Sequence, residues 1–144
     1  MAKKGVLTWI LAILGTILVW LPILAPLIFG LISLAAIGIF RLDYLMPGEL
    51  FLMVIGGALA LLWASLRAQS LAKWVIWTSV SVVVLLVVSQ VVAVVTGLAN
   101  GSVPPGGWQQ TLVMILFAGY IAAVILLGLV AIRLLFVLGR KKSA

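Results

Sequence analysis

Four long apolar runs alternate with short polar or basic stretches along the chain. Each run is close to the length that an α-helix needs to cross a hydrocarbon core of about 30 Å. We therefore expect membrane-spanning helices at approximately residues 5–21, 50–66, 74–98 and 111–132. The basic heptapeptide from Arg67 to Lys73 separates the second run from the third. Because a charge in hydrocarbon costs at least a few kcal/mol, this segment must lie in water or among lipid headgroups.

Residues 22–40 extend the first apolar run beyond one ordinary span. No charge occurs between Gly5 and Phe40, and one straight helix over this stretch would be about 54 Å long. Pro22 and Pro26 predict a break, since proline removes a backbone donor and kinks or ends a helix. Residues 22–40 then either return across the membrane, which gives five spans, or form a broken, re-entrant or tilted segment beside four spans.

The distribution of the nine Lys and Arg residues favours four crossings. Four crossings place eight of them on the side of both termini and leave Arg41 alone on the other, whereas five crossings divide them six to three. Cytoplasmic loops carry an excess of Lys and Arg. The sequence therefore predicts a multi-pass protein of the inner or plasma membrane with both termini in the cytoplasm. The residues that set this orientation are Lys3, Lys4, Arg67, Lys73, Arg140, Lys141 and Lys142, together with Arg133 near the end of the last run.

Composition places the chain in a bilayer. Apolar residues make up 67% of it and charged residues 8%, against about 45–50% and about 25% in soluble domains. We predict an all-α integral membrane protein, a four-helix transmembrane bundle that forms one polytopic domain over residues 1–144. A net charge of +7 can indicate nucleic acid, but these cations lie at the edges of apolar runs, so the expected partner is membrane lipid and not nucleic acid.

The start of the chain has a second interpretation, a secretory signal peptide with Lys3 and Lys4 as its basic region. The small residue nearest to a suitable cleavage position is Ala25, and Pro26 directly after it is a poor neighbour for cleavage. The sequence therefore favours a retained first span.

Side chains that carry chemistry are scarce. Cysteine and histidine are absent, which excludes disulfides and Cys- or His-based metal, haem and nucleophile arrangements. The two carboxylates, Asp43 and Glu49, flank a proline turn beside Arg41, and Glu49 would suit the first turn of the following helix, where the helix dipole favours an acid. We expect no catalytic residue, metal site or cofactor, and a function that is not enzymatic.

Small residues predict close helix contacts. Gly56, Ala60 and Ala64 recur every fourth residue on one helix face, and Ala68 continues the spacing. Gly119 and Ala123 repeat it in the last run. Such faces let helix backbones approach closely. The leading hypothesis is therefore an accessory or oligomerising subunit that packs through these faces, in a homo-oligomer or a larger membrane complex.

A small oligomeric transporter or channel is the alternative. Prolines at membrane depth free backbone groups that transporters use to bind ions or substrates, and the third run carries polar residues that could continue such a path. The candidate residues are Pro22, Pro26, Ser81, Ser89 and Gln90. An amide facing lipid would be unsatisfied, so Gln90 is expected to find a partner.

Tryptophan positions give a weaker indication of depth. Trp and Tyr gather at both membrane interfaces. Four crossings would place Trp63, Trp74 and Trp77 near the inner interface and Trp20, Tyr44 and Trp108 near the outer one.

Overall fold

Four helices form the described part of the protein. The computed structural model describes residues 5–38, 48–104 and 106–143, without the side chains of residues 48, 49 and 141–143. The helices are α1 (Val6–Ile37), α2 (Gly48–Ala68), α3 (Ala72–Val95) and α4 (Trp108–Ser143), and no strand occurs in these ranges. All four are long and apolar enough to cross a membrane, which confirms the predicted all-α class.

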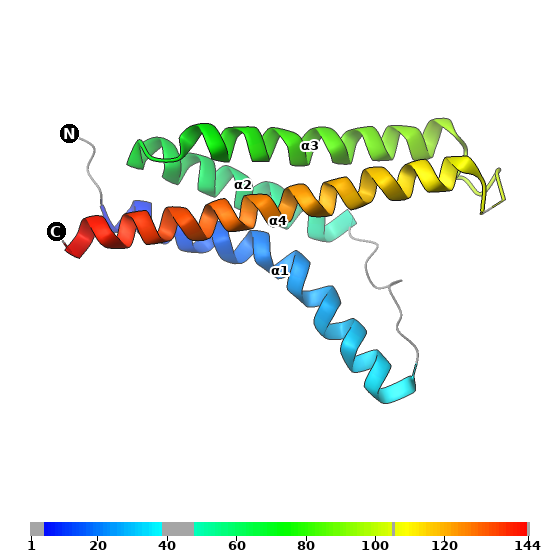
Figure 1. Cartoon of the computed structure of the whole chain (residues 1–144), viewed down its shortest axis with the longest axis horizontal. Coiled ribbons are helices and arrows are strands. Elements are labelled where there is room, and N and C mark those ends of the chain that lie inside the picture. Colours follow the sequence, from blue (N-terminus) through cyan, green and yellow to red (C-terminus); the bar gives the residue numbers. More distant parts are fainter. Residues whose placement is uncertain (1–4, 39–47, 105, 144) are drawn as a thin grey trace.

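Consecutive helices run in opposite directions, and the sharp α2–α3 turn joins two of them (Figure 1). Helix α1 packs most extensively against α2, and α3 against α4, while α4 also contacts α1. Small and aliphatic side chains fill the core between them. Its fully enclosed members include Ala12 and Val19 of α1, Leu61 and Ala64 of α2, Val75 of α3, and Leu127, Ala131 and Leu134 of α4.

Helix α1 passes through both prolines without ending. The sequence predicted an end at Leu21, but α1 is helical from Val6 to Ile37, with Pro22 and Pro26 inside it. Figure 1 shows that α1 bends near its middle and that its second half diverges from the other helices. Proline has no backbone N–H to donate to the carbonyl four residues earlier, and its ring crowds that carbonyl, so a bend at this point is expected. No turn back to a separate fifth span occurs within residues 5–38.

The other helices differ from the predicted spans mainly at their ends. Helix α2 includes Gly48 and Glu49, so Glu49 lies in a first turn as predicted. Helix α3 ends at Val95, where Thr96 and a left-handed Gly97 close it. Helix α4 continues past Arg133 as far as Ser143, since the apolar period persists in Leu134 and Leu138, which are both buried.

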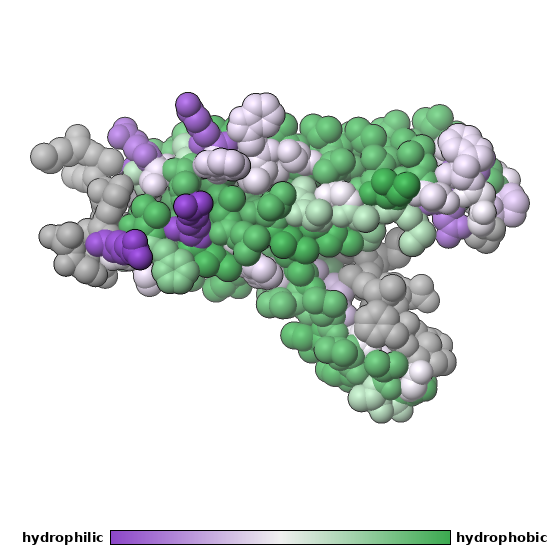
Figure 2. Space-filling view, viewed as in Figure 1, coloured by the Kyte–Doolittle hydropathy of each residue, from purple (hydrophilic) through white to green (hydrophobic). Residues whose placement is uncertain are grey.

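Basic residues gather at one end of the bundle. The start of α1, the α2–α3 turn and the end of α4 lie together at that end, and the α3–α4 connection lies at the other (Figure 1). Figure 2 shows hydrophilic side chains over the basic end and a nearly continuous hydrophobic surface along the helices between the two ends. Arg67 and Lys73 belong to the α2–α3 turn region, and Arg140 to the last turns of α4. Lys3 and Lys4 fall outside the described residues, and the side chains of Lys141 and Lys142 are not described.

The basic end of the bundle is expected on the cytoplasmic side of the membrane, and labelling can test this. The chain has no cysteine, so single cysteines report accessibility without interference. In intact cells, Ser70→Cys in the α2–α3 turn is expected to resist a membrane-impermeant thiol reagent, while Asn100→Cys in the α3–α4 connection is labelled. Opening the cells should make Ser70→Cys reactive. Labelling of both sites from the same side would contradict the crossing pattern.

Candidate functional site

Helices α1 and α2 approach each other closely at two glycines. A Cβ atom added to Gly57 would lie 2.9 Å from Val19 Cγ2 and 3.0 Å from the carbonyl oxygen of Gly15. A Cβ added to Gly15 would lie 2.7 Å from Leu61 Cγ and 2.9 Å from the carbonyl oxygen of Gly57. Each glycine therefore faces the other helix's backbone, and neither position has room for a side chain.

The predicted packing residues differ in how deeply they are buried. Ala64 and Ala68 are buried, whereas Gly56 and Ala60 are half-buried. A Cβ on Gly56 would meet only Leu18 Cδ1, at 4.0 Å. On α4, Ala123 is buried and Gly119 lies against Leu85 of α3. The sequence analysis missed Gly15 and Gly57. The spacing of small residues over Thr8, Ala12, Gly15 and Thr16 is the signal that could have indicated the partner face on α1.

Trp20 of α1 contacts α4 at Gly128. Its indole Nε1–H donates a hydrogen bond of 3.2 Å to the carbonyl oxygen of Gly128, and the ring covers this glycine so closely that a Cβ there would lie 2.8 Å from Trp20 Cε2. Trp20, which the sequence analysis expected near the outer interface, packs between α1 and α4. A buried indole N–H needs an acceptor, and a helix carbonyl beside a glycine is accessible to it.

The polar residues of α3 are mostly satisfied within their own helix. The Ser81 hydroxyl donates to the carbonyl oxygen of Trp77 at 2.9 Å, and the Ser89 hydroxyl donates to that of Leu86 at 2.8 Å. Thr78 and Thr96 bond the carbonyls of earlier residues in the same way. Such bonds let a hydroxyl sit in an apolar helix without lining a path.

The residues of the predicted polar path are not brought together in one chain. Pro22 is half-buried and Pro26 is buried, both on α1, while Ser81, Ser89 and Gln90 belong to α3. Among the described residues α1 and α3 make no contact. Completing a path from these residues would therefore require a second chain.

Together with Ser79, Gln90 is an exception on α3. Its side chain is exposed on the outside of the helix and makes no hydrogen bond with any described residue. Val87, Val91 and Val94 around it are also exposed. We refer to Val87, Gln90, Val91 and Val94 as the Gln90 face. It is an apolar surface with one amide that no described residue bonds.

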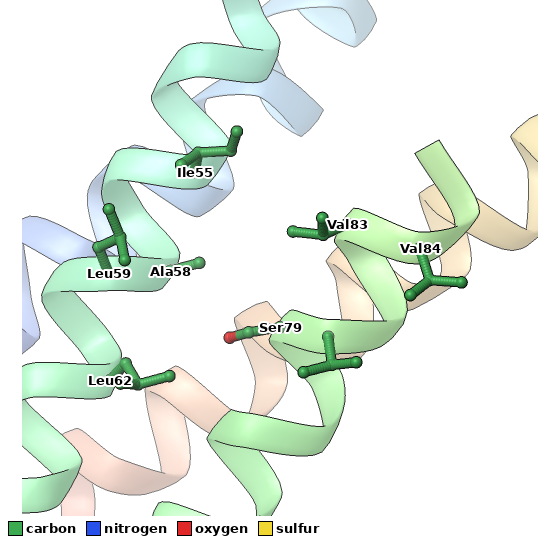
Figure 3. Close-up of a pocket in the computed structure, with 8 residues that line it drawn as sticks. Ile55, Ala58, Leu59, Leu62, Ser79, Val83 and Val84 are labelled. Atoms are coloured by element: carbon green, nitrogen blue, oxygen red, sulfur yellow. The ribbon is translucent and has the colours of Figure 1, made fainter. Parts of the chain in front are cut away.

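A groove of about 250 Å³ lies between the middle of α2 and the first half of α3. Figure 3 shows the Ser79 hydroxyl directed from α3 into the space that faces α2. Ser79 is 7% exposed, and its Oγ has no hydrogen-bond partner. The remaining lining is apolar: Ile55, Ala58, Leu59, Leu62, Val80, Val83 and Val84. Sequence analysis missed Ser79, because nothing in its spacing separates it from Ser81.

No group of three or more metal-ligating side chains occurs among the described residues. Asp43 lies outside them. Among the described residues, the side chains without a hydrogen-bond partner in apolar surroundings are the buried hydroxyls of Thr8 and Ser79 and the exposed amide of Gln90.

Comparison of the chain with family models, with curated proteins and with solved structures found no match.

Proposed function

We propose that this chain is a small multi-pass membrane protein that acts as a non-enzymatic, oligomerising or accessory subunit. The observation that carries the proposal is the Gln90 face. An amide left without a partner in hydrocarbon is costly, and Gln side chains hydrogen-bond across helices in membranes. A second helix against α3 would satisfy the Gln90 amide and cover the valines beside it.

The position of the predicted packing faces supports this choice of surface. Ala64, Gly119 and Ala123 are occupied by contacts within the chain, so they leave little surface for another subunit. Gln90 follows Lys73 by about 25 Å of helix, and its exposed side chain is open to a neighbouring helix. The exposed valines there offer the flat, stiff surface that van der Waals packing between helices requires.

Loss of the Gln90 amide is expected to weaken assembly. Gln90→Leu keeps the size and apolar character of the face but removes its hydrogen bonds, so the dissociation constant of the oligomer should rise about three- to twentyfold. Analytical ultracentrifugation in mild detergent measures it. Ser81→Ala is the matched control, because its hydroxyl is already bonded within α3, and it should leave the constant unchanged. A wild-type protein that stays monomeric and carries no co-purified partner would contradict the proposal.

Transport through an oligomer is the second candidate, and the α1 prolines favour it. Pro22 and Pro26 have no N–H to donate to the carbonyls four residues earlier, those of Leu18 and Pro22. Two backbone acceptors inside an apolar helix therefore lack their usual donors. Labelling discriminates the two functions. Reaction of Gln90→Cys with a membrane-impermeant thiol reagent in the assembled protein would indicate water beside α3 and favour transport, and protection would favour packing.

A further inference from the structure

We propose that the α2–α3 groove binds one anionic phospholipid, with an acyl chain in the groove and the phosphate at Arg67 and Lys73. The inference rests on the membrane placement of the chain but not on assembly through the Gln90 face. Three features of the groove carry it: its buried hydroxyl, the order of residue types along both helices, and its unpaired cations.

The Ser79 hydroxyl is the polar feature inside the groove. It is buried, aimed at the gap toward α2, and lacks a partner (Figure 3). Neighbouring hydroxyls on α3 bond carbonyls of their own helix, whereas this one is directed away. Because a buried unsatisfied hydroxyl is unfavourable, an acceptor from outside the chain is expected. Ser79 follows Lys73 by about 9 Å of helix, so an ester carbonyl below a headgroup held at Lys73 would lie within its range.

Both walls of the groove change character in the same order toward the basic end. On α2, Leu59, Trp63 and Arg67 recur every fourth residue and so follow one strip of the helix. On α3, the strip from Val80 continues through Trp77 to Lys73. Trp63 and Trp77 are 60% and 72% exposed. Across one leaflet of a bilayer, aliphatic side chains face the acyl chains, indoles lie at the interface, and cations meet the headgroups. The two strips follow the same order.

Charge identifies the headgroup. Neither Arg67 nor Lys73 forms an ion pair with a described residue, and the whole chain has only two carboxylates, in a net charge of +7. Two cations on adjoining helix ends are suited to one phosphate. An anionic glycerophospholipid supplies the phosphate, the ester acceptor and the acyl chain in one molecule.

Native mass spectrometry of the full-length protein in mild detergent, titrated with phosphatidylglycerol, tests the proposal. One tightly held lipid per chain is expected, with phosphatidylcholine bound more weakly. Arg67→Gln with Lys73→Gln should raise the dissociation constant for phosphatidylglycerol about tenfold or more. The matched control, Arg133→Gln with Arg140→Gln, removes two cations from α4 and should change it by less than about threefold.

Filling the groove provides a second test. Ser79→Phe places a ring where the acyl chain is expected and should abolish the tight site, while Leu126→Phe, on the exposed surface of α4, should not. Circular dichroism confirms that each variant keeps its helices; if Ser79→Phe does not fold, Ser79→Ala, which removes the hydroxyl and leaves the groove open, should weaken binding severalfold.

Two results would overturn the proposal. One is a dissociation constant that is equal for phosphatidylglycerol and phosphatidylcholine, or that does not change in the Arg67→Gln, Lys73→Gln double variant. The other is efficient disulfide formation between two copies of the Ser79→Cys variant in the membrane, since a second copy would then occupy the groove. The lipid titration does not depend on the effect of Gln90→Leu, so failure of the lipid site can be distinguished from failure of the assembly proposal.

Discussion

Gly57→Leu is expected to destabilise the bundle by about 3 kcal/mol or more, because α1 and α2 cannot keep their present separation around a side chain at this position. An added Cβ would meet Leu18 Cβ, Val19 Cγ2 and the Gly15 carbonyl oxygen, all at 2.9–3.0 Å. The last of these is backbone, so no rotamer change relieves it. Reversible unfolding by SDS in mixed micelles, followed by circular dichroism, measures the loss.

The adjacent glycine provides the control. Gly56→Leu adds the same side chain one residue away, where the nearest atom of another residue is 4.0 Å from the new Cβ. It should be neutral or slightly stabilising, since leucine has the better helix propensity. Equal effects of the two substitutions would show that the α1–α2 crossing is not as close as described.

Trp20→Ala is expected to cost about 2 kcal/mol and to loosen α1 from α4. The substitution removes the indole that covers Gly128 and the hydrogen bond to its carbonyl. Part of the ring is already exposed, and lipid can replace some of its contacts, so the loss is below the 3–5 kcal/mol typical of a fully buried tryptophan in a soluble core.

Two further variants separate the hydrogen bond from the packing. Trp20→Phe keeps an aromatic ring but no N–H donor, so it should lose about 1 kcal/mol. Trp77→Ala removes an indole that is 72% exposed, and its effect on unfolding should be within about 0.5 kcal/mol. A Trp77→Ala loss as large as that of Trp20→Ala would mean that the effect comes from tryptophan in the micelle rather than from the α1–α4 contact.

The helices followed from the sequence because their cause is local. A long apolar run with charges only at its edges forms a helix in a bilayer, because a helix satisfies its backbone hydrogen bonds internally. The same pattern predicted that Arg67 and Lys73 lie at the end of the bundle where α1 starts and α4 ends. The limits of the helices were less predictable. Pro22 and Pro26 indicated a break at Leu21, but in an apolar helix the neighbouring hydrogen bonds hold the chain helical through the bend.

The contacts between helices were predicted less well. Gly56 and Gly57 are adjacent, but the four-residue spacing of small residues runs through Gly56, since Leu61 follows Gly57 by four positions. Which of the two glycines faces α1 depends on the rotation of α2 about its axis, which is set by the shape of α1 at Gly15 and Val19. The same applies to Ser79 and Ser81, two serines on one helix of which one faces a groove and the other bonds its own backbone.

By itself the sequence determined the class, the number of long apolar helices and the clustering of cations at one end, because hydropathy and charge act residue by residue along the chain. Tertiary structure alone decided which glycine lies at the α1–α2 crossing, that Trp20 bonds Gly128, and that the hydroxyls of Thr8 and Ser79 are buried without a hydrogen-bond partner. Those outcomes depend on atoms far apart in sequence meeting within a few ångströms, and the order of residues in one helix does not encode the rotation of another.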